Sequence, residues 1–288
     1  MVDLAAGAVV PGSARRKDLD PDGSEAEILG QVVACGALLP AAGGERWGVA
    51  IPGPFDYERG VGLFAGVGKF EALYGTDLSG ALMAGLPGPP AHVTFLNDAE
   101  AFARGEGLFG AAAGCQRAVF LTLGTGIGSA FLVGGVVQRS GPGVPPEGRV
   151  DLLQIAGLPL EEVVSTRAIE RGYARRAGTA VRGAAEVASR ARAGDAAAAA
   201  VLGSAFCRLG AALRPYLEVF APQVLVVGGA MAGSWGLIGS SFREGLSGGA
   251  AASSGALRGL TVLTAAKPAD AALLGAAACA QGRAGRSP

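Results

Sequence analysis

The sequence has few of the residues that bind structural metals or attract polyanions. A single histidine, His92, and four widely spaced cysteines form no local Cys/His cluster of the kind that binds zinc. Lysine plus arginine and aspartate plus glutamate number 24 each, so no net charge attracts nucleic acid or an anionic membrane. We therefore expect no structural zinc, buried free thiols at the cysteines, no role for His92, and neither nucleic acid nor membrane among the partners.

Long apolar segments are also absent. No uninterrupted apolar run reaches the ~18 residues of a membrane span, because the strongest candidate, 209–232, contains Arg214, Pro215 and Glu218. The amino terminus has neither the basic nor the apolar stretch of a signal peptide. Since 50% of the 288 residues are hydrophobic and 17% are charged, the chain can bury a core. We expect a soluble, cytoplasmic protein of about two domains.

Short apolar runs alternate with amphipathic or alanine-rich stretches, which is typical of α/β proteins. Strands are expected at 46–51, 92–96, 118–123, 129–133, 223–227 and 260–263. Helices are expected from Ser24, where Glu27 completes a capping box, from just after Asp98, and at 160–177, 183–193, 196–220, 235–246 and 269–280. Pro215 should kink or split the longest helix, and 247–255 should form a mobile loop.

One strand-like run leads into a loop with alternating glycines and a threonine: Gly124, Thr125, Gly126 and Gly128. Because glycine has no Cβ, the backbone N–H groups of such a loop can approach an anion. The G-x-G-x-G spacing, followed by a strand-like run, does not match a dinucleotide-binding loop, in which G-x-G-x-x-G opens a helix. A phosphate-binding β-turn like that of actin-like ATPases fits better, and an ordinary hairpin turn is the alternative.

Another strand-like run ends in the polar pair Asn97 and Asp98, and a helix follows. A carboxylate at Asp98 could accept a hydroxyl proton during phosphoryl transfer, and the neighbouring Asn97 could bind the same substrate. The alternative is structural, because Asn and Asp are common helix caps.

Two further segments are weaker signals. The apolar strand at 224–228 opens into Gly228 and Gly229, whose bare backbone could seat an adenosine. The strand at 48–51 ends in a rigid Pro-Gly-Pro turn that contains Gly53. Each is also common as a simple turn in α/β proteins.

In this order, the four segments resemble those of the ROK family of sugar kinases and repressors. The resemblance extends from about Leu4 to Ala278 and includes 158–165, which looks like the family's L-E-x-x-x-S segment. It implies an α/β fold of two lobes, the actin-like ATPase (ribonuclease H-like) architecture, N-terminally incomplete. Residues 1–112 plus 268–288 would form the smaller N-terminal lobe with a returning C-terminal helix. Residues 113–267 would form the larger, nucleotide-binding lobe.

The resemblance also implies a function: ATP-dependent phosphorylation of a hexose hydroxyl, as by a glucokinase, with Mg²⁺ offsetting the phosphate charge. Asp98 would be the catalytic base. The implied sugar-binding residues are Gly53, Asn97, Glu147 and Glu161. The implied ATP-binding residues are Gly124, Thr125, Gly126 and Gly128 around the phosphates, with Gly228 and Gly229 beside the adenosine. A small-molecule sugar is the expected partner, and a homodimer is a further family expectation.

Three departures from the family pattern lead to two hypotheses. The sequence contains neither the D-x-G-x-T loop nor the E-x-G-H motif with its zinc cysteines, and either Glu147 or Arg149 matches the family's sugar-binding glutamate. Gly68 stands where the sugar loop has asparagine. The first hypothesis is a kinase whose translation starts upstream of Met1, and the second is a catalytically silent sugar sensor. A DNA-binding repressor is disfavoured, because no helix-turn-helix precedes the first strands.

Overall fold

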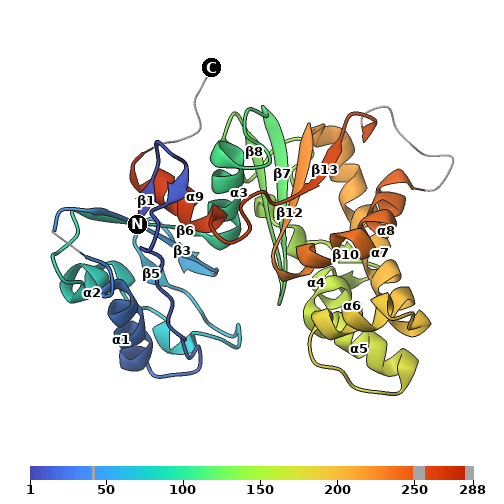
Figure 1. Cartoon of the computed structure of the whole chain (residues 1–288), viewed down its shortest axis with the longest axis horizontal. Helices are drawn as coiled ribbons and strands as arrows, with labels where there is room; N and C mark the ends of the chain where they lie inside the picture. The colour runs from blue at the N-terminus through green and yellow to red at the C-terminus, as the bar shows by residue number, and fades with distance from the viewer. Residues whose placement is uncertain (41–42, 249–256, 283–288) are drawn as a thin grey trace. The chain divides into compact units, whose positions relative to one another are not determined.

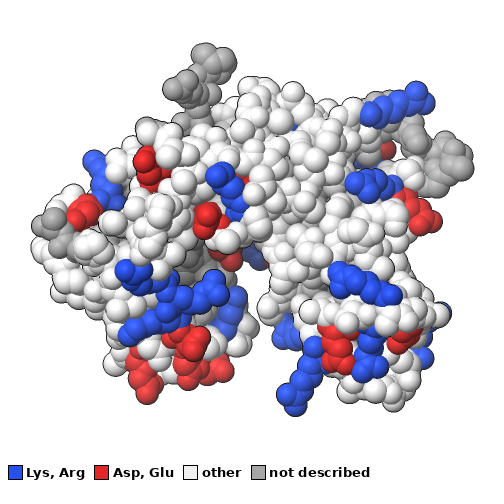
Figure 2. Space-filling view, in the orientation of Figure 1, with Lys and Arg blue, Asp and Glu red and all other residues white. Residues whose placement is uncertain are grey.

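The structure is a computed structural model that describes residues 1–40, 43–248 and 257–282. It divides into two compact units (Figure 1). Unit 1 consists of Met1–Phe109 and the segment that begins at Ala269, and unit 2 consists of Gly110–Pro268. Acidic and basic side chains are interspersed over the face shown in Figure 2, in keeping with the balanced charge of the sequence. Each unit buries a hydrophobic core of its own.

Unit 1 is built on two parallel strands. β3 (Arg46–Ile51) pairs with β6 (His92–Asn97), so that Ile51 lies opposite Asn97. The other elements of unit 1 are β1 (Val2–Asp3), β2 (Ala8–Val9), α1 (Glu25–Gly36), β4 (Phe55–Asp56), β5 (Val61–Gly62), η1 (Glu71–Leu73), α2 (Leu78–Gly85), α3 (Asp98–Phe109) and α9 (Ala271–Ala280). The strands predicted at 46–51 and 92–96 are thus confirmed.

The predicted capping box at the start of α1 is also confirmed. Ser24 Oγ accepts a hydrogen bond from the backbone N–H of Glu27 at 3.4 Å, and Ser24 N donates to Glu27 Oε2 at 2.8 Å. Two N–H groups that the helix cannot satisfy are therefore satisfied locally. Ser24 Oγ also donates to Glu27 Oε2 at 2.6 Å, and this bond, together with the one from Ser24 N, lowers the pKa of Glu27. The next residue, Ile28, is buried in the core of unit 1.

The C-terminal helix α9 packs against α3 and β3 (Figure 1), and at three glycines the backbones touch directly. A Cβ on Gly105 of α3 would lie 1.9 Å from Ala271 O, and a Cβ on Gly275 of α9 would lie 1.9 Å from Ala101 O. A Cβ on Gly48 of β3 would lie 2.1 Å from a carbonyl oxygen of α9. These distances are far inside van der Waals contact, so only glycine fits at the three positions.

Unit 2 is built on a five-stranded sheet in the order β13-β12-β7-β8-β9. β12 is parallel to both β13 and β7, whereas β7, β8 and β9 are antiparallel neighbours. Its strands are β7 (Arg117–Leu123), β8 (Ile127–Val133), β9 (Val136–Gln138), β12 (Val224–Gly228) and β13 (Thr261–Thr264). The predicted strands of this half of the chain are confirmed within one or two residues, and β7 and β12 are almost entirely buried.

Helices cover this sheet. They are α4 (Glu161–Val164), α5 (Thr166–Ala177), α6 (Ala184–Arg192), α7 (Ala196–Phe220) and α8 (Trp235–Ser247). Short elements complete the unit: η2 (Pro146–Gly148), η3 (Val150–Leu152), β10 (Gln154–Ile155), β11 (Leu158–Pro159) and η4 (Ala230–Ser234). The loop predicted at 247–255 lies almost wholly outside the described residues, and Ser247 belongs to α8.

The expected split of the long helix at Pro215 is wrong, because α7 continues to Phe220. Proline removes the hydrogen bond to the carbonyl four residues earlier, here that of Ala211. Both residues are exposed, so water can satisfy the carbonyl of Ala211. Proline is tolerated inside this helix because it lies on the solvent face.

The single helix expected at 160–177 is two helices. Ser165 has an extended backbone conformation, with φ −62° and ψ 161°, and its side chain accepts a hydrogen bond from Ala168 N at 3.3 Å. Ser165 is therefore the N-cap of α5, and it ends α4 at the preceding residue. Serine favours this role because its short polar side chain competes for backbone N–H groups.

α7 is long and apolar enough to cross a membrane by length and composition, with a mean hydropathy of 1.6 over an 18-residue window. In unit 2, however, Leu202, Phe206, Leu209 and Leu213 of this helix are all buried in the hydrophobic core. The apolar character of α7 is therefore accounted for by packing within a globular unit.

The glycine contacts of α3 and α9 give a first prediction. Replacing Gly105 by alanine should lower the free energy of unfolding by about 1–3 kcal/mol, because the new Cβ must displace the backbone of α9. The matched control is Gly30→Ala in α1, where a Cβ meets nothing within 4 Å and alanine should stabilise the helix by about 0.5–1 kcal/mol. Urea unfolding followed by circular dichroism measures both, and equal stability of the two variants would contradict the packing described.

Candidate active site

In unit 1 the candidate residues lie at the carboxyl ends of two neighbouring strands. Because β3 and β6 are parallel and Ile51 lies opposite Asn97, both strands end at the same edge of the sheet. The Pro-Gly-Pro turn, which contains Gly53 and a cis peptide bond between Gly53 and Pro54, follows β3. Asn97 and Asp98 end β6 and begin α3. The structure therefore gathers Gly53, Asn97 and Asp98 at one edge of unit 1.

Asn97 is the N-cap of α3. Its Oδ1 accepts hydrogen bonds from the N–H groups of Ala99 at 2.9 Å and Glu100 at 3.3 Å. Its Nδ2 donates to the hydroxyl of Tyr57 at 3.2 Å, and that hydroxyl donates to the carbonyl oxygen of Ile51 at 3.3 Å. The capping interpretation is thus correct for Asn97. Its amide is held by three partners, and one N–H has no acceptor among the described residues.

Sequence reasoning missed Tyr57. Its hydroxyl joins the end of β3 to the end of β6, and a Cβ on Gly53 would lie only 3.3 Å from it. The Tyr57 ring packs on Phe55, with ring centroids 5.3 Å apart. The available signal was a tyrosine three residues after the Pro-Gly-Pro turn that follows β3, but sequence alone does not show where its hydroxyl points.

Asp98 is the first residue of α3 and is exposed. Its Oδ1 accepts a hydrogen bond from Ala99 N at 2.9 Å, and its other carboxylate oxygen has no partner among the described residues. The amino-terminal end of a helix stabilises a negative charge. Asp98 can therefore present a charged, solvent-accessible oxygen as a hydrogen-bond acceptor.

In unit 2 the glycine loop is the turn of the β7–β8 hairpin. Leu123 pairs with Ile127, and Gly124 N donates to Gly126 O at 3.0 Å. The backbone N and Oγ1 of Thr166, the first residue of α5, both donate to Gly124 O, at 3.2 and 2.8 Å. The hairpin geometry agrees with the returning strand that the sequence indicates. It leaves Thr125 exposed at the tip and places Gly128 in β8.

Residues from two other parts of the sequence meet this loop. A Cβ on Gly126 would lie 2.2 Å from Glu161 Oε1, so the Glu161 carboxylate rests against the bare backbone of Gly126. Gly229 has φ +82°, and a Cβ there would lie 2.4 Å from Leu123 O. Gly228, the last residue of β12, lies beside β7. Unit 2 thus brings the glycine loop, Glu161 and the Gly228–Gly229 pair together.

Glu147 lies on a segment that is anchored beside the glycine loop. Ser129 Oγ donates to Gly148 O at 2.8 Å and accepts from Val150 N at 2.9 Å. Glu147 has φ +57°, and its side chain is 70% exposed. The nearby Arg149 is 2.6 Å from Asp151 and 3.6 Å from Glu147. The hydrogen bond to Asp151 is the main cause of its raised pKa.

The candidate residues are therefore divided between the two units. Gly53, Asn97 and Asp98 belong to unit 1, whereas Glu147, Glu161 and all the glycines predicted to bind ATP belong to unit 2. Among the described residues, no group of three or more His, Cys, Asp or Glu side chains could hold a metal ion. The four cysteines are free thiols and are half-buried rather than fully buried.

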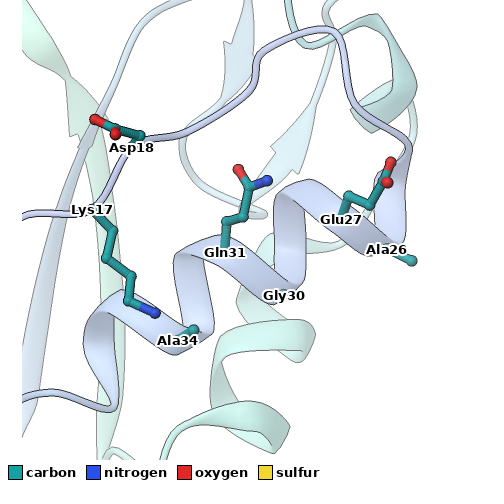
Figure 3. A pocket seen from close by; sticks show the side chains of 7 residues that line it. All are labelled: Lys17, Asp18, Ala26, Glu27, Gly30, Gln31 and Ala34. Atoms are coloured by element: carbon teal, nitrogen blue, oxygen red, sulfur yellow. The ribbon is translucent and has the colours of Figure 1, made fainter.

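A cavity of about 440 Å³ in unit 1 lies over α1 and is lined by none of these residues (Figure 3). Its polar lining includes Lys17, Glu27 and Gln31. Glu27 is bonded to Ser24, and Gln31 Oε1 accepts a hydrogen bond from Asp20 N at 2.9 Å. Local hydrogen bonds thus engage both of these side chains.

Comparison with known proteins identifies the family. The model of the ROK family matches residues 45–283. The chain belongs to the ROK family. The resemblance of the sequence motifs to this family is confirmed, and the α/β fold is that of the actin-like ATPase sugar kinases.

Curated proteins similar in sequence include a glucokinase and a bifunctional enzyme. A glucokinase of Thermotoga maritima is 31% identical over 219 residues, which cover 68% of this chain and 67% of the glucokinase. A bifunctional enzyme NanE/NanK of Brucella suis is 34% identical over 159 residues, which cover 52% of this chain and 28% of that enzyme. This chain therefore matches little more than a quarter of the bifunctional enzyme.

The solved structures similar to this chain include a ROK kinase and a ROK transcriptional regulator. A ROK family glucokinase from Streptomyces griseus, in complex with glucose and AMPPNP, has a TM-score of 0.74 and 25% identity, covering 96% of this chain and 93% of that one. A ROK family transcriptional regulator, a homolog of the E. coli MLC protein, has a TM-score of 0.68 and 20% identity, covering 92% of this chain and 69% of that one. At that identity the regulator shows the shared fold alone.

The cap at Asn97 gives a second prediction. Asn97→Ala removes both hydrogen bonds to the first turn of α3 and should lower the free energy of unfolding by about 0.5–2 kcal/mol. Asn97→Ser keeps a capping oxygen and should recover most of that loss, although it lacks the amide that reaches Tyr57. Denaturant midpoints of the two variants test the assignment. An alanine variant as stable as the parent chain would show that the cap contributes nothing.

Proposed function

We propose that this chain is a glucokinase-like hexose kinase, which transfers the γ-phosphoryl group of ATP to a sugar hydroxyl in the cytoplasm. The observation that carries the proposal is the exposed Asp98 carboxylate at the end of β6, held by Ala99 N through one oxygen and unengaged at the other. A carboxylate so placed can accept the proton of an attacking hydroxyl. The 31% identity to a glucokinase supports this reaction class.

The sugar ligands in this proposal are Gly53, Asn97, Glu147 and Glu161. Asn97 has one N–H left to donate to a sugar oxygen, beside the acceptor Asp98. Carboxylates such as those of Glu147 and Glu161 can accept hydrogen bonds from sugar hydroxyls. Glu147 is preferred to Arg149 here, because Arg149 is engaged by Asp151 whereas the Glu147 side chain is largely exposed.

The nucleotide site in this proposal is the glycine loop of unit 2. Gly124, Thr125, Gly126 and Gly128 would bind the phosphates, and Gly228 with Gly229 would border the adenosine. The fit is supported by bare backbone, since a side chain at Gly126 would collide with Glu161 and one at Gly229 with Leu123. The described residues offer no acidic cluster for a divalent cation. Mg²⁺ bound to the ATP phosphates would supply charge neutralisation there.

A second function is a catalytically silent sugar-binding sensor. It is favoured by the sequence 143–150, which contains no E-x-G-H motif and has Arg149 at one of the two possible positions of the sugar-binding glutamate. The fold is shared with a ROK transcriptional regulator. Sugar binding without phosphoryl transfer would distinguish this function from a kinase.

The decisive variant is Asp98→Asn. It keeps the side-chain volume and a hydrogen-bond acceptor but removes the base, so kcat should fall about 10²–10⁴-fold while hexose affinity stays within about threefold. A coupled assay of ADP formation with a panel of hexoses measures kcat, and calorimetry measures hexose affinity.

The matched control is Asp18→Asn. It removes an exposed carboxylate of unit 1 that is far from Asp98 in the sequence, and it should leave kcat unchanged. An Asp98→Asn variant as active as the parent would show that Asp98 is not the base. A parent chain that binds hexose but phosphorylates none of the panel would support the sensor.

Tyr57→Phe tests a positioning role at the same edge of unit 1. The ring can keep its contact with Phe55, but the hydroxyl that holds the Asn97 amide is lost. We expect KM for the hexose to rise about 3–10-fold, kcat to change less than KM, and thermal stability to stay close to that of the parent. A fall in kcat with no change in KM would contradict this role.

A further inference from the structure

Unit 2 has a cavity of about 480 Å³ that the proposed kinase reaction does not use. Its lining comes from β11, α4, α5 and α7, and includes Arg175 and Arg176 of α5 and Arg208 of α7. None of the lining residues is among those proposed to bind the hexose or ATP. Its volume is in the range of small-molecule sites, ~300–1,000 Å³.

The cavity carries an excess of positive charge. Its only acidic lining residue, Glu162, forms an ion pair with Arg171, which lies outside the lining. Among the described residues, Arg175, Arg176 and Arg208 have no acidic partner within ion-pair distance. Three exposed guanidinium groups therefore share one cavity whose carboxylate is already neutralised.

Helix stabilisation explains only part of this arrangement. Arg175 and Arg176 lie in the last turn of α5, where basic side chains interact favourably with the helix dipole. Arg208 lies in the middle of the 25-residue α7, about halfway along, where the dipole offers no such gain. The presence of Arg208 in the same lining as Arg175 and Arg176 is therefore better explained by a ligand that all three bind.

Apart from Ser204, the uncharged side chains that line the cavity are apolar. Ile169 and Ala205 are buried beneath it, and Val163 and Val201 contribute partly buried side chains. Gly172 opens the space between α5 and α7, because a Cβ there would lie 3.1 Å from Val201 Cγ1. The cavity thus combines an apolar surface with a cationic rim.

We propose that this cavity binds a small phosphorylated molecule with an apolar part. Guanidinium groups bind phosphate oxygens through paired N–H donors, and three of them can offset the roughly two negative charges of a phosphate monoester or the larger charge of a short oligophosphate. The apolar wall would receive the body of the ligand. α5 begins at Thr166, which contacts the glycine loop, and ends at this cavity, so one helix joins the two sites within unit 2.

Phenyl phosphate is a suitable probe, because it has one phosphate and one apolar ring. We expect the full chain to bind it, by isothermal titration calorimetry at constant ionic strength, more tightly than inorganic phosphate, and to bind neutral phenol more weakly. The double variant Arg175→Gln/Arg208→Gln should weaken phenyl phosphate binding at least about tenfold. Arg243→Gln, an exposed arginine of α8 outside the lining, should leave the affinity unchanged.

Three outcomes would overturn the proposal: no binding by the parent chain at millimolar phenyl phosphate, equal binding by the double variant, or equal losses in the double variant and the Arg243 control. Binding unaffected by the double variant would place the phosphate elsewhere, for example at the glycine loop. The single variant Arg208→Gln provides a second measurement should the double variant fold poorly. The readout is binding alone, so it is independent of whether the chain phosphorylates sugars.

Discussion

The structure depends on backbone-to-backbone contact at positions where no side chain fits. In unit 1, Gly105 and Gly275 let α3 and α9 touch through their main chains, and Gly48 does the same for β3 and α9. α3 begins at the candidate base, and β3 ends at the turn that contains Gly53. The contact that holds these elements therefore also fixes where the candidate residues at their ends lie. A bulkier residue would disturb the core and the candidate site together.

The same constraint operates at the glycine cluster of unit 2, with a different consequence. Gly229 must lack a side chain because the backbone of Leu123 occupies the space, and at Gly126 the carboxylate at the end of the Glu161 side chain occupies it. Strand ends far apart in the sequence thereby present adjacent N–H and carbonyl groups without side chains. Such a surface suits a phosphate or a flat base, since either can approach the main chain closely.

Much of this could be predicted from sequence because it rests on local patterns. The apolar runs that form β3, β6, β7 and β12 are evident, and so is the Ser24–Glu27 capping box. What could not be predicted depends on tertiary surroundings. Pro215 is tolerated because its helix face is exposed, which a linear pattern does not reveal. Tyr57 acts through a hydroxyl that reaches Asn97, 40 residues later, and only the parallel pairing of β3 with β6 makes that contact possible.

Asn97 shows how a structural role and the proposed sugar-binding role can share one side chain. Its carbonyl oxygen accepts the capping bonds of α3, and one of its N–H groups donates to Tyr57. These bonds fix the amide and leave one N–H group as a donor. Asp98, the next residue, offers a single free acceptor oxygen. A sugar hydroxyl needs one of each, because it can accept from the amide while it donates to the carboxylate. Capping is therefore no argument against substrate binding here, since it is the cap that orients the donor beside the acceptor.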